Sequence, residues 1–587
     1  MCGIYGIIGK VDLIKKSISA LKSLEYRGYD SSGLAFIDNK SNLQILKSVG
    51  EIKNLDNLAQ GLNDNTNTLI AHTRWATHGK ISNENAHPHY TDNVAIVHNG
   101  IITNHKELNK KLNTYKFYGD CDSETIAKLI DFYLQSNSYL DAFTNAVNDL
   151  KGSFAILCIF KGIAKKILVA KKDSPIFIAK TENDIVVSSD LIAMPKETKE
   201  YIEVNDNEIY EITDKKITLY DFNLNKKEIT FHKFNIEENK TSLENYKHFM
   251  IKEINDIPKA LKDTYDNLAN IDNIFSNIDY SIYNEIVFIG CGTAYHSACI
   301  GAYLVEKIAK KNAKAYIASD FIDYPHKLSK SELYVFISQS GETFDTIDAL
   351  KKVKNENIST ITITNTSYST LSRISDYVLP IKAGKEVAVA STKVYNATNL
   401  ALLYFANKIK NSKFDYKNIR INYNEIKRIL DSNFESKFAK KLINYKNIFF
   451  IGKCEDYLLA KEASLKLKEI TYINSSAHPS GELKHGTLAL IDENSLVVAY
   501  LTNSNYIEKM QSAICEIQTR GGKVLLVTNQ LGLDLNADFN FNLYDDSEIS
   551  TILYSIIPMQ KISYYSALLL NNNPDKPRNL AKSVTVA

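Results

Sequence analysis

Cysteine is scarce in this chain of 587 residues, and the cysteines show no paired spacing. There are seven of them, an odd number, and no two stand in a CxxC pair. Such usage argues against a disulfide framework and favours a reducing compartment. We therefore expect a cytoplasmic protein.

Long apolar runs and an excess of one charge are also missing. No run of about 18 apolar residues could span a bilayer, and no charged segment followed by an apolar one marks a targeting signal. The 70 Lys and Arg residues almost balance the 68 Asp and Glu residues, without long like-charged blocks. Membranes and nucleic acids are therefore not expected as partners.

The length of the chain predicts two or three domains, because single cores stop growing well below 587 residues. The first 235 or so residues hold short β-branched runs such as NVAIVHNG and GSFAILCIF, together with a predicted helix from Ser123 to Tyr139. A polar segment at 235–245 precedes an amphipathic helix that begins near Tyr246. We place a domain boundary in this polar segment.

The remaining chain repeats one order of elements: an apolar strand, a Gly- or Ser-rich turn, and a helix. Buried apolar strands that alternate with helices predict parallel, doubly wound sheets. The segment that begins at Asn447 echoes the one that begins at Glu285. This similarity indicates an internal duplication.

Two turns of the first repeat are candidates for phosphate binding. In SQSGET, the side chains of Ser338, Gln339, Ser340 and Thr343 lie between a predicted strand and the N-terminus of a helix, where backbone N–H groups bind anions. VASTK forms a similar turn. An ordinary capped helix explains either turn alone equally well, but not both together with GCGT. GCGTAY has Tyr295 where a dinucleotide fingerprint needs its third glycine, and no GxxxxGK[ST] is present.

The chain opens with MCGI, which places Cys2 directly behind the initiator methionine. Removal of Met1 would give Cys2 a free α-amine beside its thiol, a nucleophile with its own base. An apolar strand edge explains the same ten residues, and on those residues alone we favour the strand edge.

Three further features of the second half are candidates for catalysis. Glu462, Lys466 and Glu469 fall on one helix face, so the lysine could tune two carboxylates, although spacing alone favours a surface ladder of ion pairs. GELKHG sets His485 among glycines, and the apolar C-terminal tail PRNLAKSVTVA contains Lys582. A lysine that forms a Schiff base must be buried, which the sequence does not show.

Six of the twelve histidines fall between His72 and His105, including the HPH pair His87 and His89. Their spacing matches no standard zinc pattern, and no carboxylate or thiol pair completes one. We expect a polar network here, and neither a metal nor an external cofactor.

Together these motifs resemble one family over essentially the whole chain. MCGI, LEYRGYDSSG, HTRWATHG, NAHPH, VHNGI and GDCDSE are similar to a class II glutamine amidotransferase domain. GCGT, SQSGET, VASTK, KLKEI, GELKHG and PRNLAKSVTV resemble a pair of sugar isomerase (SIS) domains. The combination resembles the glutamine:fructose-6-phosphate aminotransferases. It implies an α/β fold: an N-terminal-nucleophile αββα sandwich (1–236) followed by two doubly wound parallel-sheet SIS domains (246–425 and 426–587).

For the first half, the resemblance implies glutamine as substrate and Cys2 as its nucleophile. Asn99 and Gly100 would form the oxyanion hole, Arg74 and Asp122 would hold the α-carboxylate and α-ammonium of glutamine, and Trp75, the only tryptophan, would gate the passage of ammonia. The matched motif also assigns Thr77 and His78 to substrate binding.

For the second half, it implies fructose 6-phosphate as substrate. Lys582 would form the imine, His485 would open the ring, and Glu469, supported by Lys466 and Glu462, would move a proton from C1 to C2. The remaining sugar-binding residues implied by the motifs are Thr293, Ser338, Gln339, Ser340, Thr343, Val389, Ser391 and Ala581.

The resemblance also implies a homodimer. Ala294, Tyr395 and Thr487 depart from residues common in the family, which affects fine substrate affinity and leaves the reaction class unchanged. The alternatives are an amidotransferase for another acceptor, a sugar-phosphate sensor that has lost catalysis, and a deglycase-like isomerase protein. The sensor predicts damage at the catalytic positions, and Cys2, Asn99, Glu469, His485 and Lys582 are all intact.

Overall fold

The computed structural model describes residues 2–62, 66–76, 79–234, 242–325, 327–533, 535–545 and 547–584. The chain divides into two compact units, one of residues 1–238 with 583–587 and one of residues 239–582. The division falls inside the polar segment at 235–245. The predicted domain limits, including the one between residues 425 and 426, stay predictions.

Two antiparallel sheets form the centre of the first unit. The larger one has the order β15-β11-β9-β10-β1-β4-β2-β3, and the smaller one β14-β13-β12-β8-β7-β6-β5. The strands of the larger sheet are β1 (Gly3–Ile8), β2 (Ser31–Ile37), β3 (Leu43–Val49), β4 (Thr68–Arg74), β9 (Phe177–Lys180), β10 (Ile185–Ser188), β11 (Glu200–Glu203) and β15 (His232–Lys233). Those of the smaller sheet are β5 (His89–Tyr90), β6 (Val94–Ile102), β7 (Gly152–Phe160), β8 (Lys166–Lys172), β12 (Glu208–Thr213), β13 (Ile217–Asp221) and β14 (Lys226–Lys227).

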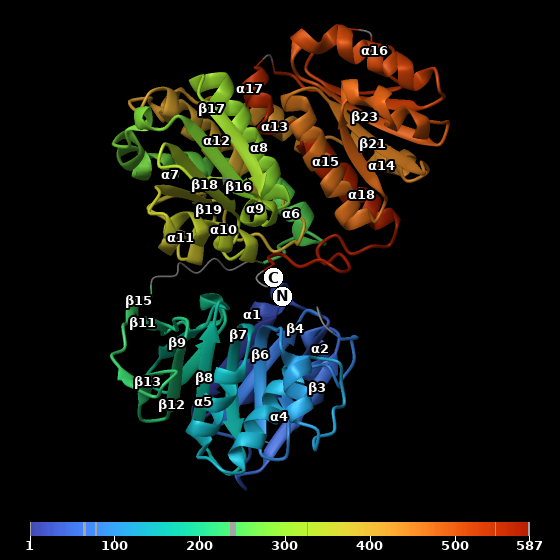
Figure 1. The fold of residues 1–587 in the computed structure, drawn as a ribbon. Coiled ribbons are helices and arrows are strands. Elements are labelled where there is room, and N and C mark those ends of the chain that lie inside the picture. Colours follow the sequence, from blue (N-terminus) through green and yellow to red (C-terminus); the bar gives the residue numbers. More distant parts are fainter. Residues whose placement is uncertain are drawn as a thin grey trace. The chain divides into compact units, whose positions relative to one another are not determined.

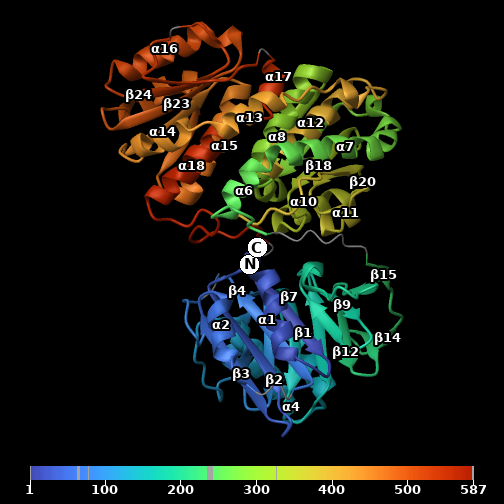
Figure 2. The same ribbon diagram turned by 180° about the vertical axis from the view of Figure 1, so that it is seen from behind.

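Strand alternation builds the four layers of this unit. Ile4 and Ile8 of β1 face the other sheet and join Val97 and Leu157 in the central core, while Tyr5 faces the opposite way. Helices α1 (Leu13–Leu24) and α2 (Ile52–Ala59) cover the outer face of the larger sheet, and α4 (Ser123–Leu134) and α5 (Tyr139–Asp149) cover that of the smaller one. Opposite views show the two helical layers in turn (Figure 1, Figure 2). The predicted αββα sandwich is confirmed; its short helix α3 spans His105–Lys111.

The second unit holds two parallel five-stranded sheets with the same strand order. The first runs β17 (Asn312–Ile317), β16 (Glu285–Gly290), β18 (Glu332–Ser338), β19 (Thr360–Thr364) and β20 (Tyr377–Pro380). The second runs β22 (Ser475–Pro479), β21 (Asn447–Gly452), β23 (Ser495–Leu501), β24 (Lys523–Thr528) and β25 (Phe539–Asn542). Both are doubly wound, and their equal order confirms the predicted duplication.

Helices cover both faces of each sheet, which explains the continuous apolar runs of the strands. Phe288 of β16 faces one apolar core while its neighbour Val287 faces another. The helices of this unit are α6 (Phe249–Asn255), α7 (Ile257–Ser276), α8 (Thr293–Leu304), α9 (Ala318–Asp323), α10 (Phe344–Asn355), α11 (Thr370–Ile374), α12 (Lys393–Lys410), α13 (Tyr423–Asp431), α14 (Phe434–Leu442), α15 (Glu455–Thr471), α16 (Ile507–Gln518), α17 (Glu548–Thr551) and α18 (Ile557–Leu569).

Helices α8 and α15 pack against each other, α8 beside β16 and α15 beside β21, so the two sheets share one apolar core (Figure 1). In the part of the chain that the structure describes, no helix combines the length and the apolar character needed to cross a bilayer.

Candidate active sites

Cys2 lies at the start of β1, beside the end of β4. The strands pair Gly3 with Thr73, which sets Cys2 next to Arg74. The Cys2 thiol lies 3.7 Å from the main-chain oxygen of Trp75. Burial raises the pKa of this thiol, and the nearby Arg74 charge partly opposes that rise. An unassisted thiol here would be protonated at neutral pH, so it needs a base to become a nucleophile.

The segment after β4 is held in place by Asp30. Asp30 Oδ2 accepts the N–H of Ala76 at 2.8 Å, and its main-chain N–H donates to Arg74 O at 3.0 Å. Arg74 is 3% exposed, and its guanidinium donates to Gly79 O at 3.5 Å. A buried guanidinium with a fixed position suits a carboxylate ligand.

Asn99 of β6 reaches Cys2 from the other sheet. Its Nδ2 donates to Cys2 O at 3.0 Å, and its Oδ1 lies 3.2 Å from His72 Nε2. The next residue, Gly100, has φ +130°, and a Cβ there would come within 2.0 Å of Ser153 O. Only glycine fits at this position, because the backbone of β7 lies too close for a side chain.

Asp122 completes this cluster from the segment before α4. Its side chain is buried, and Oδ2 accepts the N–H of Ile102 at 2.7 Å, which ties it to the end of β6. Ser123 Oγ bonds His98 Nδ1 at 2.8 Å. Thr77 and His78, also predicted for this site, lie outside the described residues.

In the second unit, the SQSGET turn joins β18 to α10 as predicted. Ser338 Oγ lies 3.0 Å from Thr343 Oγ1 and accepts the N–H of Gly341 at 3.0 Å, while Ser340 Oγ accepts the N–H of Glu342 at 3.1 Å. Gly341 has φ +67°, and an added Cβ would come within 1.9 Å of Ser369 Oγ. The turn is thus a compact set of hydroxyls and N–H groups at a helix N-terminus.

The Glu462, Lys466 and Glu469 side chains of α15 form a network around a buried lysine, with Glu469 partly exposed, which corrects the surface ladder that spacing alone favours. Lys466 and Glu462 have no exposed side-chain surface, and Lys466 Nζ lies 3.3 Å from Glu462 Oε1 and 2.7 Å from Glu469 Oε2. Helix α8 covers this face of α15, because Thr293 Oγ1 bonds both Glu462 and Lys466 at 3.0 Å.

The charged groups of this network stabilise one another's ionised forms, as the pKa shifts of Lys466 and Glu462 indicate. Burial works to lower the pKa of Lys466, but Glu462 and Glu469 outweigh it and hold that pKa above its ordinary value. Burial works to raise the pKa of Glu462, but Lys466, His296 and Thr293 outweigh it and lower that pKa. His296 Nδ1 lies 2.7 Å from Glu462 Oε2. Lys466 therefore stays a cation against which Glu469 is held.

Lys582 is buried, as Schiff-base chemistry needs. Its side chain is 4% exposed, and Nζ lies 2.5 Å from Glu386 Oε2. Glu386 is fully buried and also accepts the N–H groups of Thr392 and Val394 and the hydroxyl of Ser391, at 2.9, 3.1 and 2.9 Å. The VASTK turn therefore holds the Glu386 carboxylate in place, and this carboxylate in turn holds the Lys582 ammonium.

A second buried carboxyl, Glu253 of α6, lies in the same region. Its Oε1 accepts the N–H of Val387, and its Oε2 has no partner among the described residues. Burial and the charge of Glu386 raise the pKa of Glu253 to about 8. The pair thus carries one ionised and one protonated carboxyl near neutral pH.

The remaining predicted residues are less closely tied to this centre. Val389 N donates to Asp575 O at 3.0 Å, which joins the turn to the segment before the C-terminal tail. His485 ends a 3₁₀ turn and is exposed. Among the described residues, no hydrogen bond or ion pair links Lys582 to Glu469 or engages the His485 ring.

Sequence reasoning gave no role to four residues that the structure places in these sites: Glu386, Glu253, His296 and Asp30. Glu386 stands three residues before Val389, the first residue of VASTK, and Asp30 is part of LEYRGYDSSG, so a search of the motifs and their flanks could have found both. His296 directly follows GCGTAY, so the same search could have found it, whereas Glu253 lies outside every motif and only the fold brings it in.

The comparisons with known proteins cover the whole chain. The model of the glutamine amidotransferase domain matches residues 72–196, and that of the SIS domain matches residues 281–408 and 441–570. Proteins named glutamine–fructose-6-phosphate aminotransferase [isomerizing] are 38% identical over 611 residues in Caldanaerobacter subterraneus subsp. tengcongensis and 37% identical over 612 residues in Clostridium tetani. Each comparison spans 100% of both chains.

Solved structures agree for the second unit. The C-terminal domain of glucosamine-fructose-6-phosphate aminotransferase from Francisella tularensis matches with a TM-score of 0.51 and 32% identity, covering 57% of this chain and 100% of that one. A putative tagatose-6-phosphate ketose/aldose isomerase from Clostridium novyi matches with a TM-score of 0.51 and 20% identity, covering 58% of this chain and 94% of that one. The second likeness shows the fold alone.

Proposed function

The chain belongs to the family of isomerising glutamine–fructose-6-phosphate aminotransferases, and we propose that its two units divide the reaction as follows. The enzyme transfers the amide nitrogen of glutamine to fructose 6-phosphate and isomerises the product to glucosamine 6-phosphate, with release of glutamate. Full-length relatives with this name favour the enzyme over the sensor and over an amidotransferase for another acceptor.

In the first unit, the Cys2 thiol attacks the side-chain carbonyl carbon of glutamine. The α-amine of Cys2, free once Met1 is removed, takes the thiol proton and passes it to the leaving ammonia. Asn99 Nδ2 and the Gly100 N–H stabilise the negative oxygen of the tetrahedral intermediate. Water then hydrolyses the thioester to glutamate and regenerates the thiol.

Glutamine is selected by charge at its α-carbon. Arg74 binds the α-carboxylate and Asp122 the α-ammonium, and the buried positions of both side chains support this assignment. Thr77 and His78 complete the substrate contacts, and Trp75 gates the passage of ammonia.

In the second unit, Lys582 attacks the C2 carbonyl of open-chain fructose 6-phosphate. Water leaves to give an imine, and ammonia then displaces the lysine. The observation that carries the proposal is the Lys582 side chain, 4% exposed and 2.5 Å from Glu386. A protein that only binds a sugar phosphate has no need to bury a lysine against a fixed carboxylate.

Isomerisation follows on the same carbon skeleton. Glu469 removes a proton from C1 and returns one to C2, which converts the ketose imine to the aldose. Lys466 positions the carboxylate of Glu469 through their ion pair, and Glu462 positions Lys466. His485 opens the sugar ring, and Gln339, Ser391, Val389 and Ala581 line the sugar site around the Ser338–Thr343 turn.

We also propose a cytoplasmic homodimer. All seven cysteines are free, which fits a reducing compartment. The exposed His485 has no hydrogen-bond or ion-pair partner among the described residues, so a second subunit is a natural source of the surroundings that a catalytic histidine needs.

A paired assay tests the division of labour. Wild type and Cys2→Ala are each given fructose 6-phosphate with either glutamine or ammonium, and glutamate and glucosamine 6-phosphate are measured separately. We expect Cys2→Ala to make no glutamate and no amino sugar from glutamine, yet to make amino sugar from ammonium. Glutamate production by Cys2→Ala would contradict the role of Cys2.

A further inference from the structure

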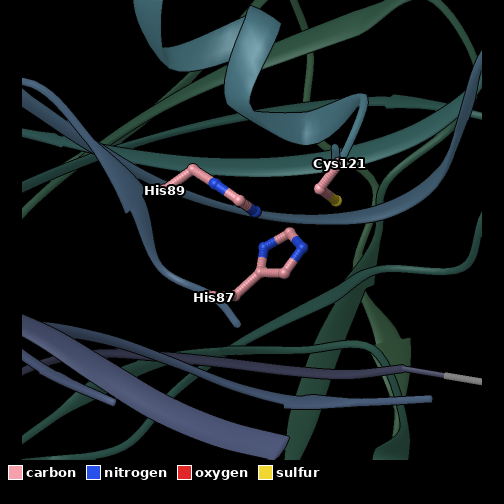
Figure 3. Close-up of side chains that lie close together, drawn as sticks. All are labelled: His87, His89 and Cys121. Atoms are coloured by element: carbon pink, nitrogen blue, oxygen red, sulfur yellow. The ribbon is translucent and has the colours of Figure 1, made fainter. Parts of the chain in front are cut away.

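Three possible metal ligands that the proposed reaction does not use converge inside the first unit. His89 lies on β5, His87 just before it, and Cys121 just before α4, which packs against β5 and β6. One ligand atom of each lies within 4.8 Å of the others. The two rings and the sulfur are turned toward one another (Figure 3).

This cluster has one possible ligand atom that the described residues leave without a partner. His89 is 2% exposed, and its Nε2 has no hydrogen-bond partner among the described residues. The Cys121 thiol lies 3.6 Å from Asp122 Oδ1 and also interacts with the neighbouring Ser123. A buried polar atom without a partner is destabilising, so the unpaired nitrogen points to a ligand from outside the chain.

His87 needs one exchange before it can bind a metal. Its Nδ1 accepts the main-chain N–H of His98 at 3.3 Å. A neutral imidazole has one lone pair for accepting, so a metal at His87 replaces this bond. Losing this hydrogen bond to gain a metal–nitrogen bond costs little, because its N···N distance of 3.3 Å is beyond the usual range.

We propose that His87, His89 and Cys121 bind a borderline-soft divalent cation of the Zn²⁺ type, with a fourth position left open. Two imidazoles and a thiolate match zinc and exclude Mg²⁺ and Ca²⁺, which take oxygen ligands. Binding releases the thiol proton of Cys121 to solvent and forms the metal–sulfur bond.

A bound cation would join β5 to the segment that carries Asp122, and it should stabilise this unit because it binds only the folded chain.

Cobalt substitution tests the site on the full-length, reduced and chelator-treated protein. Co²⁺ bound to a thiolate gives a charge-transfer band in the near ultraviolet, and a tetrahedral site gives visible d–d bands. We expect one Co²⁺ per chain with both signals, displaced by Zn²⁺ and not by Mg²⁺. We also expect Zn²⁺ to raise the melting temperature of the wild type.

The variants identify the ligands. Cys121→Ser should lose the charge-transfer band, and His89→Gln should weaken Co²⁺ binding by more than about 100-fold, the upper end of what loss of an outer-shell partner costs. Cys515→Ser, on the surface, and Cys2→Ala should keep the wild-type spectrum. Absence of the band in the wild type, or its persistence in Cys121→Ser, would overturn the proposal. If Cys121→Ser fails to fold, unchanged Co²⁺ affinity in His89→Gln would overturn it instead.

Discussion

Among single side chains, Glu386 gives the sharpest prediction. Glu386→Gln leaves the size of the side chain unchanged and removes the charge that holds Lys582. We expect amino-sugar synthesis to fall by about 100-fold or more, because a misplaced lysine no longer meets the C2 carbonyl, while glutamate release continues. Separate assays of glutamate and glucosamine 6-phosphate measure the two effects.

A second buried ion pair of the same unit supplies the control. Glu435 lies 3.3 Å from Lys561, both side chains are buried, and neither belongs to the proposed sites. Glu435→Gln should destabilise the fold by a similar amount, up to about 3–5 kcal/mol, and leave the turnover number unchanged. Equal loss of synthesis in both variants would mean that Glu386 acts only through stability.

Glu253 predicts how stability depends on pH. Its pKa is about 8 in the folded chain against an ordinary 4.5, first because of burial and then because of the Glu386 charge. Between these values the unfolded chain has lost a proton that the folded chain keeps. The free energy of unfolding should therefore fall as pH rises from about 4.5 to about 8.

Urea unfolding across this range measures the effect. Glu253→Gln should flatten the decline, whereas Glu182→Gln, on the surface, should leave it as in the wild type. The same slope in wild type and Glu253→Gln would show that Glu253 ionises normally.

Among the secondary-structure elements, the turn between β18 and α10 depends on one glycine. Gly341 has φ +67°, where a side chain is strained, and a Cβ added there would come within 1.9 Å of Ser369 Oγ. Gly341→Ala should raise the KM for fructose 6-phosphate by about 10-fold or more, which corresponds to about 1.4 kcal/mol, without changing glutamate release.

Gly532→Ala is the matched control for this turn. Gly532 has φ +81°, so alanine is strained there too, but nothing lies within 4 Å of its added Cβ. If steady-state kinetics show the two variants to be alike, the collision with Ser369 is not what shapes the phosphate turn.

Local sequence predicted which helices and strands form better than it predicted the residues at which they begin and end. One helix was predicted from Ser123 to Tyr139, and this is wrong: α4 ends at Leu134 and α5 begins at Tyr139. Ser138 is the reason, because its side chain accepts the N–H of Asp141 and so caps a new helix. The strand–turn–helix order around SQSGET, by contrast, is confirmed, since a buried β-branched strand and a helix start are both local signals.

For the whole molecule, the periodicity and repetition of the sequence predicted the α/β fold class and the internal duplication. They could not predict which charged side chains are buried, because that depends on the tertiary fold. Spacing placed Glu462 and Lys466 on one helix face, but it could not show that Thr293 and His296 of a distant helix cover them. In the same way, the histidine spacing gave no reason to expect a metal, because Cys121 reaches the HPH pair only through the packing of α4.

The most direct test of the account follows the nitrogen. The enzyme is given fructose 6-phosphate and glutamine labelled with ¹⁵N in its amide group, with unlabelled ammonium present, and the glucosamine 6-phosphate formed is analysed by mass spectrometry. We predict that the product carries predominantly ¹⁵N, and that Lys582→Arg releases glutamate but forms no amino sugar. Amino sugar without the label, or amino sugar made by Lys582→Arg, would contradict transfer from Cys2 to an imine on Lys582.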